Sequence, residues 1–465
     1  MLFNSLSFLI FLPIVFGLYW LPVKKDWWQN TVVLSASLFF YAYWDWRVLW
    51  LFVGSVVFTV LMARQITKVA KTEGGGKICL VISIAVLLGI LGVFKYYNFF
   101  ASSLAYMFDF SPDSITLSLV LPLGISFYTF MCVSYLVDTY QGKIPVTDSL
   151  IPLHLLSTFS YLSFFPQIAA GPIGRGPEML PQFAESRRFD NALAVDGCRQ
   201  FLWGLFKKVV VADGCAGLVA RLYNGYADFS GSMLLLGAFM YAIQIYCDFS
   251  GYSDMAIGVG KLFGIRLRKN FDFPYFATNI SDFWRRWHMS LTTWFRDYVY
   301  IPLGGSRCIL PRVIVNTWIV FLLSGLWHGA AWTFIAWGAV HAALISLFIL
   351  WKRTGLKLPG VVGWMLTMIG VVLAWIFFRA PNFEVALGYL EQLFSCSLFS
   401  IPRQYLSMLP WIGFMLGFEW LQRQHDHALA RLTKWRGVNW VIYLVLTVSC
   451  IAYQQRTGNF IYFQF

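Results

Sequence analysis

Residues 321–334 read FLLSGLWHGAAWTF and place one histidine, His328, inside a stretch that is otherwise mostly apolar. Ionisable residues at membrane depth are rare, and they commonly mark a pathway or a site. Burial disfavours the charged imidazolium, and the neutral ring can take a proton from an attacking hydroxyl. Under this interpretation Gly325, Gly329 and the alanines after them leave room for a narrow substrate passage. A second interpretation makes Gly325 and Gly329 a GxxxG packing face beside a structural histidine.

The whole chain has the composition of an integral membrane protein. Of its 465 residues, 58% are apolar and only 12% are charged, whereas a soluble domain carries roughly 25% charged residues. The 21 Trp and 23 Tyr fit the aromatic belts at the two membrane interfaces. Apolar segments follow one another without a Ser- or Pro-rich linker, so we predict a single integral-membrane domain over residues 1–465.

Twelve segments are candidates to cross the membrane as helices, which needs about 20 apolar residues each. A further segment, 154–172, is broken by Pro166 and Gly171-Pro172 and is predicted to be re-entrant. We therefore expect an all-α polytopic membrane protein with about 11 to 13 transmembrane or re-entrant helices. The twelve candidates are 3–22, 31–46, 47–63, 78–96, 115–137, 200–222, 231–250, 313–327, 329–350, 360–378, 405–420 and 438–455.

Basic residues predict the orientation, because Lys and Arg are retained in short cytoplasmic loops. The connection between the third and fourth segments carries such a cluster and is predicted to be cytoplasmic. Counting from it places the N-terminus outside and makes the last helix, 438–455, run outward. The final residues, 458–465 (GNFIYFQF), then lie on the extracytoplasmic side. The cluster consists of Arg64, Lys68, Lys71 and Lys77.

The longest polar region, residues 251–312, holds nine Lys or Arg against four acidic residues, a net charge of +5. The orientation makes it a basic cytoplasmic or re-entrant region. Such a face can bind anionic lipid headgroups, a phosphate-bearing donor or an acidic carrier protein. No nucleic-acid recognition motif accompanies the charge, so no nucleic-acid partner is expected.

Within this region, residues 279–307 read NISDFWRRWHMSLTTWFRDYVYIPLGGSR. His288 follows Trp284 by four residues, which predicts that both lie on one face of a helix. Asp282 and Arg286 have the same spacing and are predicted to pair. The charged residues of the window have two open interpretations: they bind donor phosphate or support a tunnel wall, or they form ion pairs on an interfacial helix. These residues are Arg285, Arg286, Arg296 and Asp297, and Trp284 is a further candidate for a donor or tunnel contact.

Several long motifs together resemble the membrane-bound O-acyltransferase (MBOAT) family, in its alginate O-acetylation branch. The strongest are WRRWHMSLTTWFRDYVYIPLGGSR and LLSGLWHGAAWTFIAWGAVHA. The resemblance extends to the N-terminal FLIFLPIVFGLYWL and covers most of the chain. Two further stretches carry it, SFFPQIAAGPIGR at 163–175 and YCDFSGYSDMAIGVGKLFGIRLRKNFDFPY at 246–275.

The resemblance implies a fold and a reaction. Helices would form a ring around a thin central tunnel in the bacterial cytoplasmic (inner) membrane, where a cytoplasmic acyl donor meets an outer acceptor. His328 would be the essential catalytic residue, with His288 as a second catalytic residue near the tunnel. The acyl group, expected to be acetyl, would come from acetyl-CoA or an acyl-carrier protein as substrate, with no bound cofactor. The acceptor would be a polysaccharide hydroxyl, reached through an extracytoplasmic SGNH-like acetyltransferase partner.

The terminal FIYFQF raises a further hypothesis about Tyr462. A similar outward-facing motif occurs in the small partner of the related teichoic-acid D-alanylation system, which suggests that Tyr462 carries the acyl group briefly. A phenol needs a base to become a nucleophile, and His328 could be that base. The alternative is an aromatic residue that anchors the chain at the interface.

Other classes of function stay open from the residues alone. Intramembrane histidines also relay protons in transporters or flippases, although no internal repeat of the kind common in transporters is visible. A scaffold that recruits an outer enzyme, and a D-alanyl-type transfer from a carrier protein, are further alternatives. The eight cysteines have no metal-ligand spacing, so no metal site is predicted. Which polysaccharide accepts the group is left open.

Overall fold

The computed structural model describes residues 1–21, 23, 25–69, 74–109, 111, 115–144, 152–402, 406–454 and 460–461. Over these residues the protein is all helix, without a strand, as the sequence predicts. The chain divides into two compact units, residues 1–198 with 256–268, and residues 199–255 with 269–465. Two helices, α10 (Asn191–Phe206) and α12 (Gly231–Leu262), contribute to both units.

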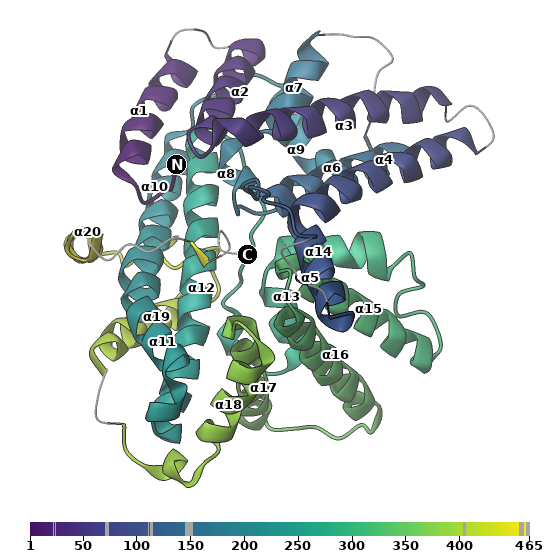
Figure 1. Cartoon of the computed structure of the whole chain (residues 1–465). Helices are drawn as coiled ribbons and strands as arrows, with labels where there is room; N and C mark the ends of the chain where they lie inside the picture. Colours follow the sequence, from purple (N-terminus) through teal and green to yellow (C-terminus); the bar gives the residue numbers. More distant parts are fainter. Residues whose placement is uncertain are drawn as a thin grey trace. The chain divides into compact units, whose positions relative to one another are not determined.

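The first unit contains the N-terminal helices, among which α3, α4 and α6 pack side by side (Figure 1). From α12, only the last two turns, which begin at residue 256, belong to this unit. The helices are α1 (Leu6–Trp20), α2 (Asp26–Ala42), α3 (Leu49–Val69), α4 (Gly75–Leu91), α5 (Tyr97–Met107), α6 (Ile125–Tyr140), α7 (Pro152–Leu162), α8 (Phe165–Ile168) and α9 (Gly176–Ala184), with the short turns η1 (Trp46–Val48) and η2 (Gly92–Tyr96).

The second unit carries all the histidines discussed below. Two of its helices, α15 and α16, form an antiparallel pair (Figure 1). The helices are α11 (Asp213–Asn224), α13 (Ile280–Arg286), α14 (Met289–Phe295), α15 (Leu310–His328), α16 (Trp332–Arg353), α17 (Gly360–Arg379), α18 (Phe383–Leu393), α19 (Leu409–Leu421) and α20 (Arg436–Tyr453), with the short turns η4 (Lys207–Ala212), η5 (Tyr226–Asp228), η6 (Pro274–Phe276), η7 (Arg296–Tyr300), η8 (Cys396–Phe399) and η9 (Leu406–Met408).

Several predicted segments have different bounds in the structure, two of them by a large margin. The segment 115–137 becomes helical only at Ile125, because Gly124 has a left-handed backbone (φ 66°) that interrupts a helix. A side chain at Gly124 would also collide with the Ile168 carbonyl oxygen. The segment 231–250 is longer than predicted, since α12 continues to Leu262. The polar region thus begins inside a helix.

The segment predicted at 200–222 is also part of a longer helix. Residues 191–224 stay helical throughout, but the turn η4 in the middle has π geometry. Such bulges are frequent at functional sites. Lys207 and Lys208 lie in this turn and are both buried, which requires partners for their charges.

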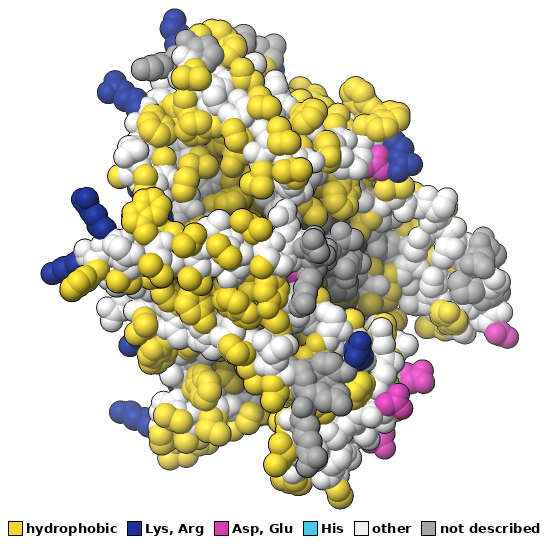
Figure 2. Space-filling view, turned by 90° about the vertical axis from the view of Figure 1, so that its left-hand side faces the viewer, with side chains coloured by type: hydrophobic (Ala, Val, Ile, Leu, Met, Phe, Trp, Pro, Cys, Tyr) yellow, Lys and Arg dark blue, Asp and Glu magenta, His cyan; other side chains and the backbone are white. Residues whose placement is uncertain are grey.

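Seven helical segments of the described chain are long and apolar enough to cross a membrane, and two shorter apolar helices accompany them. Many of their large apolar side chains face outward, as Ile14 of α1 and Leu61 of α3 do. The face in Figure 2 is largely covered by hydrophobic side chains, with few Lys and Arg. Exposed apolar surface of this extent is stable only against lipid or another protein. The protein is therefore a multi-pass membrane protein.

Candidate active site

His328 is the last residue of α15 and is buried. The helix ends there because the next residue, Gly329, has an extended backbone. The imidazole is packed edge to face against aromatic rings on three sides. Its ring centroid lies 5.0 Å from that of Trp327, 5.0 Å from Trp337 and 5.3 Å from Phe378.

The glycines beside His328 do not form an open passage, contrary to one of our expectations. A side chain at Gly325 would collide with the Phe334 carbonyl oxygen, and one at Gly329 would collide with the Phe334 ring. Gly338 meets the Phe321 carbonyl oxygen in the same way. These glycines therefore let α15 and α16 approach closely, which is the packing role of GxxxG.

His288 lies at the junction between α13 and α14 and has a left-handed backbone, with φ 45° and ψ 51°. This conformation costs a non-glycine residue about 1 kcal/mol or more, and such strain is concentrated at functional sites. His288 and Trp284 are thus not on one helical face, and the prediction of a continuous helix was wrong. The left-handed turn redirects the chain and points the two side chains to different neighbours.

Hydrogen bonds hold the His288 ring in a defined orientation. Its Nδ1 lies 3.1 Å from Oδ1 of Asn270, a buried residue that also accepts from the Ser290 hydroxyl at 2.8 Å. The Asn270 amide donates to Ser253 at 3.0 Å, so Oδ1 is the acceptor and Nδ1 of His288 carries the proton. Nε2 then holds the lone pair of the neutral ring. Burial lowers the pKa of His288 to about 3, which keeps the ring neutral at physiological pH.

The structure brings the two predicted catalytic histidines together. The ring centroids of His288 and His328 lie 6.3 Å apart, although 40 positions separate the residues in the chain. Trp327 contacts both rings, at 5.8 Å and 5.0 Å. Phe249 covers another side of His288, with its ring edge-on at 4.5 Å. The pair therefore lies in an aromatic cage that excludes bulk water.

A third histidine, His341 on α16, belongs to the same cluster and was missed by the sequence analysis. It accepts a hydrogen bond on Nδ1 from the Trp284 indole at 3.3 Å. Its ring lies 4.9 Å from Trp337, which in turn contacts His328. The sequence did contain a signal for this role of His341. Trp337 and His341 are four residues apart on one helix, so both lie on the face that contacts His328.

Three of the predicted donor or tunnel contacts, Trp284, Arg285 and Arg296, line one pocket of about 650 Å³. Lys352 and Arg353 of α16 add two more cations, and none of the described lining residues is acidic. Most of the wall is apolar. Inside it, Trp284 and Phe321 both contact His341, and Ser324 precedes His328 by about one helical turn.

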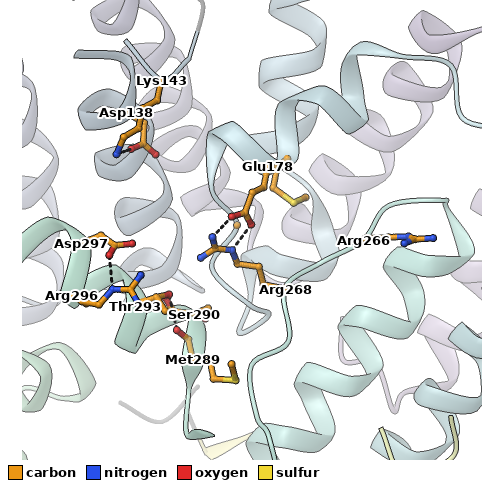
Figure 3. A network of polar contacts seen from close by, with 12 residues as sticks. Asp138, Lys143, Glu178, Arg266, Arg268, Met289, Ser290, Thr293, Arg296 and Asp297 are labelled. Carbon is orange, nitrogen blue, oxygen red and sulfur yellow. Dashed lines mark hydrogen bonds and ion pairs between the residues drawn. The ribbon is translucent and has the colours of Figure 1, made fainter. Parts of the chain in front are cut away.

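Arg286 and Asp297, the other two candidates, are engaged in ion pairs. Arg286 pairs with Asp282 at 2.9 Å, as their spacing predicted, and does not line the pocket. Asp297 binds Arg296 at 2.7 Å, a contact drawn in Figure 3. In the first unit, Arg268 of the basic region likewise pairs with Glu178 (Figure 3). Part of the positive charge of residues 251–312 is thus neutralised within the fold.

Buried ion pairs at η4 form a second group that sequence reasoning missed. Lys207 lies 2.7 Å from Asp254 and 3.6 Å from Glu419, and Glu419 also accepts from the Tyr246 hydroxyl at 2.8 Å. Lys208 lies between two further carboxylates. The two adjacent lysines within an apolar segment were the signal, since buried ammonium groups require carboxylate partners.

Two other expectations concern metals and Tyr462. The described residues include no cluster of three or more His, Cys, Asp or Glu side chains that could hold a metal ion. Tyr462 lies outside the described residues. Phe460 and Ile461, just before it, are described and buried.

Residues 38–387 match the model of the membrane-bound O-acyltransferase family, MBOAT. The chain belongs to this family. It is 39% identical over 400 residues to a probable alginate O-acetylase of Pseudomonas aeruginosa, covering 85% of this chain and 75% of the relative. It is 38% identical over 420 residues to a peptidoglycan O-acetyltransferase of Helicobacter pylori, covering 84% and 79%.

A more distant relative is a teichoic acid D-alanyltransferase of Bacillus subtilis, 32% identical over 246 residues, covering 50% of this chain and 60% of the relative. Family membership confirms the resemblance inferred from the motifs and makes the protein a membrane-bound O-acyltransferase. An enzyme of this class requires an acyl donor. The matched region includes both histidines of the cage and the cation-lined pocket.

Proposed function

We propose that this acyltransferase takes an acyl group, acetyl in the first instance, from a cytoplasmic thioester donor and delivers it to the extracytoplasmic side. The final acceptor is a hydroxyl of a cell-envelope or exported polysaccharide. The enzyme works in the bacterial cytoplasmic membrane, in helices ringed around a thin tunnel. Relatives named for O-acetylation of alginate and peptidoglycan support acetyl as the group.

The observation that carries this proposal is the pairing of His288 and His328 in one aromatic cage, with ring centroids 6.3 Å apart. Desolvation keeps imidazole neutral, and a neutral imidazole is a base at physiological pH. Asn270 supports one orientation of His288, with its Nε2 as the acceptor atom. His328, held by three rings packed edge to face, is the general base that takes the proton from the attacking hydroxyl.

The cation-lined pocket is the proposed donor site. CoA and the prosthetic group of an acyl-carrier protein both present phosphate, and Arg guanidinium groups bind phosphate with charge-assisted hydrogen bonds. Arg285 and Arg296 line the pocket together with Lys352 and Arg353. The apolar wall then receives the acyl-bearing arm. Two residues of that wall connect it to the histidines, since Trp284 binds His341 and Ser324 lies on the helix that ends at His328.

A hydroxyl oxygen attacks the thioester carbonyl carbon, forming a C–O bond and breaking the C–S bond. The hydroxyl proton passes to His328, which then gives it to the leaving thiolate. His288 holds the donor or the tetrahedral intermediate beside it. Trp284 contributes to the wall, and Arg286 and Asp297 support the pocket through their ion pairs.

Tyr462 is proposed as the first acceptor, a relay that carries the acyl group briefly on its phenol oxygen. An extracytoplasmic SGNH-like acetyltransferase would then move the group to the polysaccharide. The support is that Tyr462 directly follows Ile461 in the sequence. The main chain of Ile461 binds Asp248 of α12, in the same unit as both histidines. The relay needs a base near the phenol, and His328 fills that role.

A second candidate reaction is transfer of D-alanine from a carrier protein, favoured by the similarity to a teichoic acid D-alanyltransferase. The two reactions share the thioester attack and differ in the donor and in the acyl group that is transferred. Purified protein in vesicles, supplied in parallel with labelled acetyl-CoA and with an acylated carrier protein, separates them. Covalent transfer of label to protein or glycan is the expected result with acetyl-CoA.

The decisive variant is His328→Ala, with His425→Ala as a control that removes a histidine outside the cage. We expect transfer to be lost in the first and retained in the second. Unchanged acetylation by His328→Ala would refute its role as the base. Movement of an intact solute across the vesicle without covalent transfer would instead support a transporter or flippase.

A further inference from the structure

The chain end docks onto α12 through a buried carboxylate. Asp248 is 1% exposed, and its Oδ2 accepts a hydrogen bond from the main-chain N–H of Ile461 at 2.8 Å. The two residues are 213 positions apart in the sequence. A main-chain donor on a buried carboxylate gives a charge-assisted bond, which is stronger than a neutral one.

Asp248 shares its ammonium partner with a second carboxylate. Its Oδ1 lies 2.8 Å from Nζ of Lys208, but the same ammonium also binds Asp213 at 2.7 Å. Asp248 and Asp213 thus share the Lys208 ammonium as an ion-pair partner. An additional N–H donor therefore stabilises the group, because an unsatisfied buried charge is costly. Ile461 supplies that donor.

The residue before Ile461 adds an aromatic contact to the hydrogen bond. Phe460 is buried, with its ring centroid 4.9 Å from Tyr252 and 6.0 Å from Phe249. Asp248 and Tyr252 are one helical turn apart on α12, so they present one face to the chain end. A peptide bound through one main-chain hydrogen bond and one ring is held in both position and register.

A single aromatic ring, that of Phe249, separates Phe460 from His288. Phe249 contacts Phe460 on one side, and its ring lies 4.5 Å from His288, edge to face, on another. Displacing Phe460 would therefore remove the packing behind Phe249 and loosen the wall of the His288 cage. Asp248 does not touch the imidazole, so it acts through other residues.

We propose that Asp248, with Lys208, Phe249 and Tyr252, forms a docking site for the C-terminal segment of the same chain. Asp248 is a positioning residue that fixes Ile461, directly before Tyr462 in the sequence, against the wall of the His288 cage. The functional half of this inference rests on the proposed acyl transfer. The docking half rests only on the contacts of Phe460 and Ile461.

Three variants separate docking from the general need for buried charge. Asp248→Ala removes both the acceptor for Ile461 and one partner of Lys208. Asp248→Asn keeps an oxygen for Ile461 but removes the charge. The matched control Asp213→Asn removes a charge from the same lysine without touching the chain end. Size-exclusion profiles and thermal midpoints of the purified proteins establish that all three are folded.

The first measurement is hydrogen–deuterium exchange of the C-terminal peptide that contains Ile461. We expect at least tenfold faster exchange of this peptide in Asp248→Ala, an intermediate rate in Asp248→Asn, and the wild-type rate in Asp213→Asn. Equal exchange in the wild type and Asp248→Ala would overturn the docking site. Because this measurement does not depend on the reaction catalysed, it tests the docking site independently of the proposed function.

The second measurement is transfer of labelled acetyl in the same variants. Activity should fall about tenfold in Asp248→Ala, less in Asp248→Asn, and less than twofold in Asp213→Asn. Equal losses in Asp248→Asn, Asp248→Ala and Asp213→Asn would show that the Lys208 ion pairs matter only for folding, and would overturn the positioning role. Full activity of Asp248→Ala with a released chain end would overturn it as well.

Discussion

The two histidines of the cage reach it by different local structures. His328 lies at the end of a regular helix and packs against three aromatic rings. His288 stands in a left-handed turn and is hydrogen-bonded to Asn270, which is itself held by Ser253 and Ser290. Ring contacts fix where an imidazole lies, whereas hydrogen bonds also fix which nitrogen carries the proton. The difference suggests separate tasks, proton transfer for His328 and oriented binding for His288.

Replacing the histidines one at a time tests this division most directly. We expect His328→Ala to lower acetyl transfer by a factor on the order of 10² to 10⁴, the usual contribution of a general base. His288→Ala should cost roughly tenfold, the effect of one lost hydrogen bond. Initial rates with labelled acetyl-CoA provide the measurement. Equal losses would mean that the two residues share one task.

The role of His288 can also be tested by placing a negative charge beside it and measuring how activity depends on pH. The pKa of His288 is about 3, so in the wild type protonation of this ring does not limit activity above about pH 4. Asn270→Asp adds a carboxylate and should raise that pKa by roughly one to three units. Activity of the variant should then fall as the pH drops through 6 to 4, because imidazolium has no lone pair to accept a hydrogen bond.

The control for this pH profile is Ser290→Ala, which removes a donor to Asn270 without adding charge. Its profile should match that of the wild type. An Asn270→Asp profile without a new acid limb would show that the protonation state of His288 is irrelevant to the reaction.

A smaller effect is expected at the donor pocket, which touches both histidine-bearing segments through Trp284 and Ser324. Arg285→Gln and Arg296→Gln should each raise KM for acetyl-CoA by roughly three- to tenfold with little change in kcat, because partly exposed charge contacts are screened by water and salt. Arg286→Gln is the comparison, since Arg286 pairs with Asp282 and does not line the pocket, so its effect on KM should be smaller. A KM effect at Arg286 equal to that at Arg285 would argue against this pocket.

The smallest effect concerns stability. His341→Phe preserves a ring but leaves the buried Trp284 indole N–H without its acceptor, which should lower the free energy of unfolding by about 1–3 kcal/mol. Thermal unfolding in detergent measures it. In the double variant with Trp284→Phe, the two losses should not add, because the shared hydrogen bond is lost only once. Full additivity would contradict the pairing.

Much of the candidate site could be read from the chain, but its geometry could not. The Asp282–Arg286 pair followed from helical spacing and is confirmed. The shared face of Trp284 and His288 followed from the same rule and was wrong, since the rule assumes an unbroken helix. The open passage at Gly325 was wrong because a glycine permits either space or close packing, and the position of Phe334 on the next helix decides which.

By itself, the sequence determined the membrane class, the helical fold and the family, because composition, apolar length and long motifs are local properties of the chain. It also singled out His328 and His288. Only the tertiary structure decided that Asn270 orients His288, that His341 binds Trp284 and that Asp248 receives Ile461. The physical reason is that each of these hydrogen bonds joins residues 18 to 213 positions apart, and their donors and acceptors meet only after the helices pack.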